Sequence, residues 1–469
     1  MPTQNEYNTA KKRQRIESIK IQLLNYKLQI VDEIQGNVVG QPSFTINADN
    51  DIRRTCNFTI IPTDSSFDIK YGSKLWLDKY VKVYKGIKTS VYSDDFEWTN
   101  MGIYLINNPQ HAYSANSNTI TINGIDLMAK LTGLRNGNIE GMSYIIPQGS
   151  NIRNVMIDLL ALAGFTNYSI DEPTIIIDSQ ETQSLPYEIK VDAGGTIYNI
   201  LSQLKDVVAD YQMYFDVDGT FCFNRIPNGE NMTPIVTDDI WDKVLISYNR
   251  NYDFSTVKNS ITVLGKVHDI VNYSDGTYST SYNTYVLSIA SLVTIIDKTV
   301  IGCVVDSTHT ISTIRVNNTN YNICNELGES SITLNEDEYY VFQYDSSKTK
   351  FIFLGHVQPT ATVEETNIES PYYVNGTMGK VRIVLSGGEY DNIYSDELAK
   401  QRAKKELYLR CKLNDSLSLQ CVPIYWLDVN TVIEITIPNK HGDEEKNKYM
   451  IKQININDSQ SITLERLYD

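Results

Sequence analysis

The side chains best suited to acid–base or metal chemistry are scattered along this chain of 469 residues. It holds five histidines, and none has a cysteine or a second histidine at the spacing of a zinc site. No HExxH, HxH or GxSxG pattern occurs, so the sequence indicates neither a zinc hydrolase nor a serine hydrolase. A lone imidazole has no partner to act with, so each histidine is predicted to lie in a turn or on the surface. The five are His111, His268, His309, His356 and His441.

Other groups that could bind ligands also have structural explanations. Residues 193–196 (AGGT) precede a predicted helix, whose N-terminus can hold an anion. They lack the lysine and the glycine spacing of a phosphate loop, so helix capping is predicted. Residues 216–219 (DVDG) lack the rest of a calcium loop and are predicted to form a hairpin turn. Residues 443–446 (DEEK) are predicted to be a charged loop between two strands.

Two further patterns suggest carbohydrate chemistry. The 57 acidic residues allow many carboxylate pairs, but a glycosidase pair comes together only in the fold and none is marked by spacing. The tyrosines of residues 339–344 (YYVFQY) could form a sugar platform, but alternation along a strand explains them too. We therefore predict no catalytic, cofactor-binding or metal-binding residue, no cofactor, and no enzyme activity.

Charge and cysteine content restrict the class of protein further. A net charge of −16 argues against general nucleic-acid binding, which needs a basic face. The one basic cluster, residues 11–15 (KKRQR), is predicted to be a solvated arm, with a nucleic-acid arm as the alternative. The absence of a CxxC motif, of an apolar leader and of a run of about 18 apolar residues predicts a protein made in a reducing cytosol without a membrane span. The cysteines, predicted to be small core residues, are Cys56, Cys222, Cys303, Cys324, Cys411 and Cys421.

The elements that position these groups begin with a β-rich unit. Apolar residues alternate with polar ones at Ile19, Ile21 and Leu23, as in half-buried strands. The stretch FEWTNMGIYLINNPQHAYSANSNTITINGIDLMAKLTG repeats this alternation, with turn residues expected at 107–109 and 114–118. Gly124 is expected to form a bend, and Asp126 to start a short helical turn.

Helical periodicity takes over further along the chain. Residues 150–164 are predicted to form a helix capped by Ser150 and ended by Gly164. A second helix is predicted to start at Thr196, and the stretch YQMYFDVDGTFCFNRIP is predicted to form a β-hairpin. Strand patterns then return, with a hairpin turn expected at residues 274–276 and a strand at 292–296. A helix in SDELAKQRAKKELYLRCKL precedes the last strands.

Several of these stretches resemble a known family in their order. The stretches are IRRTCNFTI with WLDKYVKVYKGI, the stretch from Phe96 to Gly133, GGTIYNILSQLKDVVADYQMYFDVDGTFCFNRIP, VKNSITVLGK and the C-terminal WLDVNTVIEI and YMIKQININ. In this order, they are similar to the baseplate hub (tail-tip) proteins of tailed bacteriophages. These are related to the hub section of type VI secretion spikes. Residues 286–357 depart from the simplest hub and are similar to small β-modules of other phage tail proteins.

The resemblance implies a mainly β fold with α+β connector domains, two tube-like β-barrels per chain and a small inserted β-module. The expected division is a basic arm (1–15), a first barrel (16–147), an α+β connector (148–242), a second barrel (243–285 and 358–390), the inserted module (286–357), and a helix with C-terminal strands completing the second barrel (391–469).

The implied function is structural. A homotrimer would join the sixfold tail tube to the threefold central spike and surround the DNA channel, in the virion baseplate after assembly in the bacterial cytoplasm. Expected partners are a tail tube or distal tail protein, the spike, a tape-measure protein and baseplate wedge proteins. DNA would only pass through. The alternative is a receptor-binding or cell-wall carbohydrate-binding tail protein acting through residues 286–357.

Overall fold

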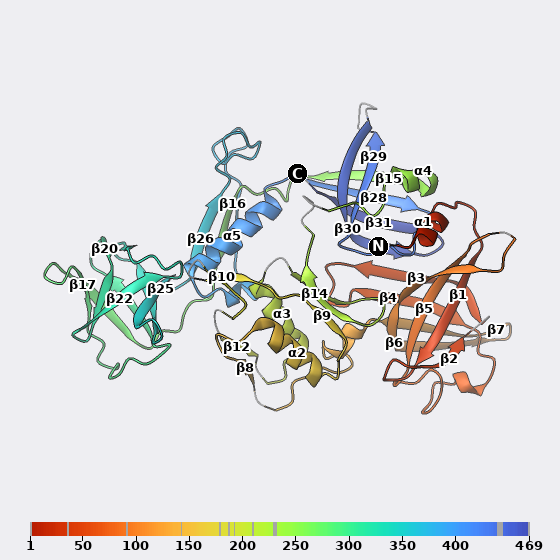
Figure 1. Ribbon diagram of the computed structural model, residues 1–469, viewed down its shortest axis with the longest axis horizontal. Coiled ribbons are helices and arrows are strands. Elements are labelled where there is room, and N and C mark those ends of the chain that lie inside the picture. The colour runs from red at the N-terminus through yellow and green to blue at the C-terminus, as the bar shows by residue number, and fades with distance from the viewer. Residues whose placement is uncertain are drawn as a thin grey trace.

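The computed structural model describes the whole chain except residues 1, 35–36, 91, 142, 178–179, 186–187, 192, 209–210, 228–231, 439–443 and 468–469. It is an elongated molecule built mostly of β-strands (Figure 1). A small barrel forms one end, two packed β-units form the other, and helices α2, α3 and α5 lie between them. The predicted class, mainly β with α+β parts, is confirmed.

The largest element is one continuous sheet of twelve strands. Its path runs β15-β28-β31-β30-β3-β4-β7-β6-β5-β1-β2, and β29 pairs with β30 beside that path. Residues 44–47 of β3 pair with residues 453–456 of β30, so strands from the two ends of the chain are directly hydrogen-bonded. The strands predicted for two barrels are thus connected in one sheet.

We call the two halves of this sheet the N-terminal and C-terminal β-units. The N-terminal β-unit holds β1 (Glu17–Leu24), β2 (Ile30–Ile34), β3 (Val38–Asn47), β4 (Arg54–Ile60), β5 (Tyr80–Lys88), β6 (Phe96–Ser114) and β7 (Ser117–Ile125), with short 3-10 turns η1 (Ser65–Phe67) and η2 (Leu127–Lys130). The C-terminal β-unit holds β15 (Leu245–Asp253), β28 (Asn414–Cys421), β29 (Val432–Pro438), β30 (Glu444–Ile456) and β31 (Gln460–Arg466).

The long hairpin β6–β7 differs from its prediction at one turn. Residues 107–109 do not form a turn but an irregularity within β6, where the pairing with β7 shifts register. Pro109 has no N–H to give to the ladder, and Asn108 takes a left-handed φ of 44°, so the strand accommodates both as a bulge. His111 consequently lies in a strand opposite Ile120, not in a turn.

Close packing explains Gly124 at the other end of this hairpin. A Cβ atom there would lie 2.5 Å from Sγ of Cys56 and 2.8 Å from Cβ of Tyr104. The glycine therefore admits these neighbours within a regular strand, so the expected bend is wrong. Asp126 does start a helical turn as predicted, because its Oδ1 accepts a hydrogen bond of 2.9 Å from the amide of Met128.

The connector domain is α+β, as predicted. Asn151, and not Ser150, caps α2 (Ile152–Leu162), and Gly164 follows that helix with φ of 82°. Thr196 caps α3 (Ile197–Val207) in a capping box with Asn199. The remaining elements are β8 (Tyr144–Ile146), β9 (Tyr168–Ile170), β10 (Ile175–Ile177), β11 (Gln180–Thr182), β12 (Ile189–Val191), β13 (Tyr211–Phe215), β14 (Phe221–Arg225) and α4 (Asp238–Val244).

A closed barrel with its own apolar core forms one end of the molecule. It begins at Tyr273, thirteen residues before the predicted module. Residues 274–276 lie inside a strand, so the hairpin turn predicted there is wrong; the chain turns at 280–283, where Asn283 has φ of 51°. Residues 292–296 form no strand. Seven strands close the barrel: β17 (Tyr273–Ser279), β18 (Thr284–Leu287), β19 (Val300–Val305), β21 (Thr313–Val316), β22 (Thr319–Asn325), β24 (Tyr339–Asp345) and β25 (Lys350–His356), while β20 (His309–Ile311) pairs with β23 (Ile332–Leu334).

A small unit, which we call the α5 unit, links this barrel to the rest of the chain. Helix α5 (Asp396–Arg410) packs on a sheet of β26 (Thr360–Glu364), β16 (Ser260–Leu264) and β27 (Arg382–Leu385), preceded by the 3-10 turn η3 (Gly388–Asn392). Ser395 caps α5. The sequence assigned β16, β26 and β27 to the second barrel, but they form this separate sheet, whereas β15 joins the twelve-stranded one.

Candidate functional site

The histidines do not gather into one centre. Nε2 of His111 lies 2.7 Å from Oδ1 of Asn118, and Nε2 of His268 lies 2.7 Å from the carbonyl oxygen of Tyr394. His309 stacks on Tyr278. His356 lies between two carboxylates, and His441 falls outside the described residues.

The other predicted ligand groups have structural roles where they are described. Thr196 caps a helix, and Asp216 accepts hydrogen bonds from the amides of Asp218 and Thr220 in the hairpin turn. In the YYVFQY stretch, Tyr340 is buried, and Tyr344 packs edge-on against Tyr321. Of residues 443–446, residue 443 is outside the described part and 444–446 begin β30.

The described part of the chain lacks two further features. It contains no group of three or more His, Cys, Asp or Glu residues placed to hold a metal ion. Within the same residues, no helix is long and apolar enough to cross a membrane.

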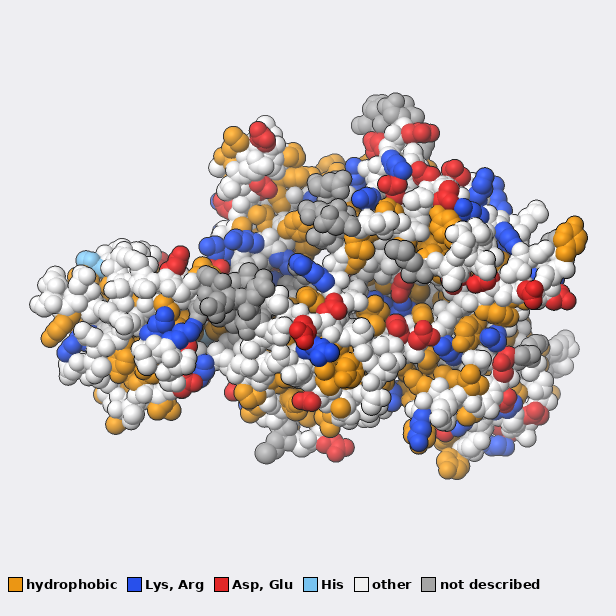
Figure 2. Space-filling model, in the orientation of Figure 1, with side chains coloured by type: hydrophobic (Ala, Val, Ile, Leu, Met, Phe, Trp, Pro, Cys, Tyr) orange, Lys and Arg blue, Asp and Glu red, His pale blue; other side chains and the backbone are white. Residues whose placement is uncertain are grey.

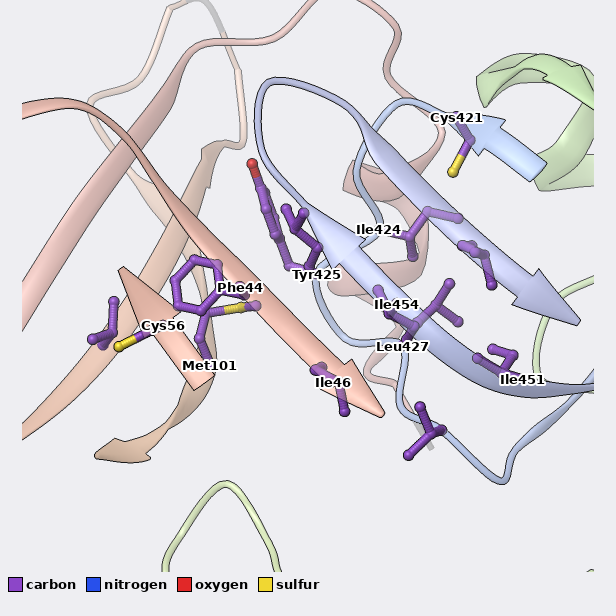
Figure 3. Close-up of a cluster of buried hydrophobic side chains, with 14 of the residues drawn as sticks. Phe44, Ile46, Cys56, Met101, Cys421, Ile424, Tyr425, Leu427, Ile451 and Ile454 are labelled. Carbon is purple, nitrogen blue, oxygen red and sulfur yellow. The ribbon is translucent and has the colours of Figure 1, made fainter. Parts of the chain in front are cut away.

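The structure instead concentrates buried polar groups at the seam between the two β-units. An apolar core runs across this seam (Figure 3). Phe44 and Ile46 of β3 belong to the same buried cluster as Ile454 of β30 and Leu427, so one core serves both units. Because packed apolar surface is the main stabilising term in folding, the two units behave as one body.

A first polar cluster lies beside this core. Nζ of Lys85, on a side chain only 1% exposed, lies 3.6 Å from Oε2 of Glu17. The Tyr425 hydroxyl donates to the same oxygen at 2.7 Å, and Nε of Arg15 lies 2.9 Å from the other one. Burial lowers the pKa of Lys85, and the carboxylate of Glu17 opposes that shift. This cluster joins β1 and β5 to the C-terminal β-unit.

A second polar cluster joins three domains. The buried guanidinium of Arg54, at the start of β4, donates from Nη1 to the carbonyl oxygen of Phe215 in the connector at 2.7 Å. Its Nη2 pairs with Asp428 of the C-terminal β-unit. Arg53 donates to Gln212 at 2.7 Å, and Asn430 donates to the same amide oxygen at 2.6 Å. We call these residues the three-domain junction.

The connector hairpin makes a further contact near this junction. Oδ1 of Asp218 accepts hydrogen bonds of 2.9 Å from Lys82 and from Asn100 of the N-terminal β-unit. The predicted turn thus has a docking role, which its sequence did not indicate.

The N-terminal segment differs from the solvated arm expected for it. Residues Gln4–Ala10 form helix α1, begun by a capping box at Thr3. Tyr7 donates to Asp239 of α4 at 2.7 Å and stacks on Trp426, and Lys11 forms an ion pair with Asp239 at 2.7 Å. The basic residues here are used within the chain: Lys11 pairs with α4, and Lys12 and Arg13 donate to the carbonyl oxygens of Lys88 and Lys243.

The main path of the long sheet, leaving β29 aside, ends in two open edges. Among the described residues, β2 pairs only with β1, and β15 pairs only with β28. Ile30 and Val31 of β2 are 61% and 52% exposed, and Ile246 and Tyr248 of β15 are 60% and 40% exposed. Apolar edge strands of this kind are templates for pairing with another chain.

Asp126, at the edge of the junction, gives a testable pH dependence. Its carboxylate accepts from the amides of Arg54 and Met128, both at 2.9 Å. Burial nevertheless raises its pKa from 3.8 to about 6. The folded protein therefore binds more protons here than the unfolded chain, and this group's contribution to stability falls as pH rises from 4 through about 6.

We expect Asp126→Asn to remove this pH-dependent contribution to the free energy of unfolding. The difference in urea midpoint between wild type and the variant should shrink between pH 4 and 6.5 and stay constant above it. Thr132→Val, beside η2 but without an ionisable group, is the control. An equal midpoint difference at every pH would contradict the assignment.

Comparison with solved structures shows proteins that share the fold of this chain. The 43 kDa tail protein of prophage MuSo2 from Shewanella oneidensis matches 95% of this chain over 98% of its own, with a TM-score of 0.50 and 11% identity. A tail protein from Neisseria meningitidis MC58 matches 96% of each chain, with a TM-score of 0.50 and 9% identity. The chain has the fold of these tail proteins. The predicted resemblance is thereby confirmed at the level of the fold.

Sequence comparison alone is less informative. Residues 369–469 match the model of a domain of unknown function, DUF5048. A search of curated proteins found no match. The match spans β27, α5 and the C-terminal strands β28 to β31, and so includes Asp428 of the three-domain junction.

Proposed function

We propose that the chain is a structural protein of the tail baseplate hub of a tailed bacteriophage. Three copies form a ring around the DNA channel, and the ring joins the sixfold tail tube to the threefold central spike. The fold shared with a prophage tail protein and with a second tail protein supports a tail role. The observation that carries the ring is the pair of open edges at opposite ends of one sheet.

The two edges differ in sequence, which favours an assembly in which unlike edges meet. Pairing of β15 in one copy with β2 in the next joins two different surfaces, which is a heterologous contact. Heterologous contacts repeated around an axis close into a ring when the rotation fits. Three copies would place six β-units in that ring, which matches a sixfold tube on one side and a threefold spike on the other.

Charge is consistent with a channel that DNA crosses without binding. The chain carries a net charge of −16, and like charges repel the phosphate backbone. On the face shown in Figure 2, acidic and basic side chains are interspersed over the two β-units, and the barrel end is mostly neutral. Partners under this proposal are the tail tube or distal tail protein, the spike, the tape-measure protein and the wedge proteins, in a virion assembled in the bacterial cytoplasm.

The mass of the purified protein tests the proposal. Light scattering on a size-exclusion column should give three times the chain mass of 53.3 kDa, and averaged electron micrographs should show a threefold ring with a central opening. A single 53.3 kDa species at tens of micromolar protein would contradict the ring. Binding of the full chain to bacterial cell wall, with no ring, would favour the alternative receptor- or carbohydrate-binding role through residues 286–357.

A further inference from the structure

In the part of the chain that the structure describes, the closed barrel meets the α5 unit without a shared apolar core. The barrel has its own apolar core, and so does the α5 unit. Within the described residues, no buried apolar cluster spans both. A cavity of about 270 Å³ lies at this contact, between the β22–β23 connection, the end of β25 and the start of α5. This pocket opens to solvent, so it leaves part of the contact between the barrel and α5 unpacked.

Polar groups make the contact in place of an apolar core. Nδ1 of His356, at the end of β25, lies 2.7 Å from Oδ2 of Asp396 in the first turn of α5. Its Nε2 lies 3.1 Å from Oε2 of Glu338. The backbone amide of His356 also donates to Asp396 at 3.0 Å, and the amide of Thr360 donates to its other oxygen at 2.8 Å. One imidazole thus links two carboxylates, one in the barrel and one on α5.

We propose that His356, Asp396 and Glu338 form a proton-dependent latch that fixes the barrel against α5, and that loss of the imidazole proton frees the barrel to move as an arm. The barrel lies at one end of the molecule (Figure 1), so it can turn without clashing with the β-units. Polar and loosely packed interfaces between domains of one chain permit such motion.

The direction of the pH effect follows from the charges. Hydrogen bonding to Asp396 and to Glu338 raises the pKa of His356 from 6.5 to about 9. A raised histidine pKa means that the latch is at full strength below about pH 6.5 and weakens as pH rises through about 9. Tyr340, whose ring lies beside the imidazole, donates to Glu338 and lowers the pKa of that carboxyl, which stays ionised over this range.

The ionisable groups around the cavity also weaken the contact between the barrel and α5 as pH rises. Burial raises the pKa of Glu326 from 4.5 to about 7, while the Tyr394 hydroxyl donates to it at 2.7 Å. Asp396 and Glu397 face it from α5, so its ionisation adds repulsion as pH rises. Burial lowers the pKa of His268, which faces the carbonyl oxygen of Tyr394 from the chain leading into the barrel, so it is neutral here.

Gly355 allows the latch to be broken without replacing His356, Asp396 or Glu338. A Cβ at this position would lie 2.1 Å from Oδ2 of Asp396, so Gly355→Ala displaces the carboxylate. Gly328 lies in the same barrel, has φ of 82°, and has nothing within 4 Å of its Cβ position. Gly328→Ala is therefore the matched control for the backbone strain that both changes introduce.

Distance measurements between spin labels test the latch on the full chain. Labels at Val293→Cys in the barrel and Tyr408→Cys on α5 occupy exposed positions. Cys411→Ser removes the one native cysteine that is not buried. In the otherwise wild-type protein, we expect one narrow distance distribution at pH 6.5 and a broad one at pH 10. In His356→Gln and in Gly355→Ala, we expect a broad distribution already at pH 6.5. Gly328→Ala should stay narrow.

An independent readout is the titration of the imidazole itself. In protein labelled with ¹³C at histidine, the signal that His356→Gln removes should titrate near pH 9, well above the ordinary value of 6.5. A midpoint near 6.5 would overturn the proposal. So would a distance distribution that is equally narrow at pH 6.5 and pH 10, or one that His356→Gln leaves unchanged at pH 6.5.

Discussion

Lysines at Ile246 and Tyr248 should reduce the proposed ring to single chains. Pairing of edge strands excludes water from both backbones, and an ammonium group at the edge resists that desolvation. Both side chains are exposed on β15, so the substitutions leave the apolar core of the chain untouched. Light scattering should show the mass fall from three times 53.3 kDa to 53.3 kDa.

Two further variants make this experiment decisive. Leu409→Lys changes an exposed apolar residue of helix α5, away from both edge strands, and should leave the ring intact. Lysines at Ile30 and Val31 of β2 should also give single chains. A mixture of the β15 variant with the β2 variant keeps one intact edge on each copy, so it should form pairs that cannot close. A full ring from that mixture would exclude pairing between these two edges.

Arg54→Met should produce the largest loss of stability in the monomer. Methionine fills most of the space but leaves the carbonyl oxygen of Phe215 and the carboxylate of Asp428 without their donor. Breaking a buried charge pair from one side costs about 3–5 kcal/mol. Since the Asp428 side chain is 34% exposed, we expect a value of about 3 kcal/mol, at the lower end.

Urea unfolding followed by tryptophan fluorescence measures this loss. The four tryptophans report on the β-units and α4; they are Trp76, Trp98, Trp241 and Trp426. Lys82→Met is the matched control, because it removes an ion pair between the N-terminal β-unit and the connector whose carboxylate, on Asp218, is 65% exposed. Exposed pairs contribute less than about 1 kcal/mol. Equal midpoints for the two variants would show that Arg54 does not hold the junction.

The sequence predicted local structure better than it predicted connections. Capping residues and apolar periodicity identified α2, α3 and α5 because those signals act over a few neighbouring residues. At Asn108 and Pro109 the residue types predict a turn where the structure has a bulge, since the same residue types serve both. The separate sheet of β16, β26 and β27 was missed because its strands are short and meet only in the fold.

The three-domain junction was also out of reach from sequence. Arg53 and Arg54 stand before an alternating strand, where charged residues are usually solvated. What makes them structural is that Gln212, Phe215 and Asp428 surround them, and these residues come from positions more than 150 residues away. The one indication in the sequence is that two adjacent arginines stand at the start of a strand, which is unusual for solvated residues.

The pairing of β3 with β30 has a consequence for how the chain is made. About 400 residues separate the two strands, so a ribosome adding about 5–20 residues per second takes on the order of 20–80 s to deliver β30 after β3. During that time the edge of β3 is unpaired and open to aggregation. The barrel of residues 273–356, whose strands are close in sequence, can complete itself within the same interval. A nascent chain should therefore need a chaperone mainly for its first β-unit.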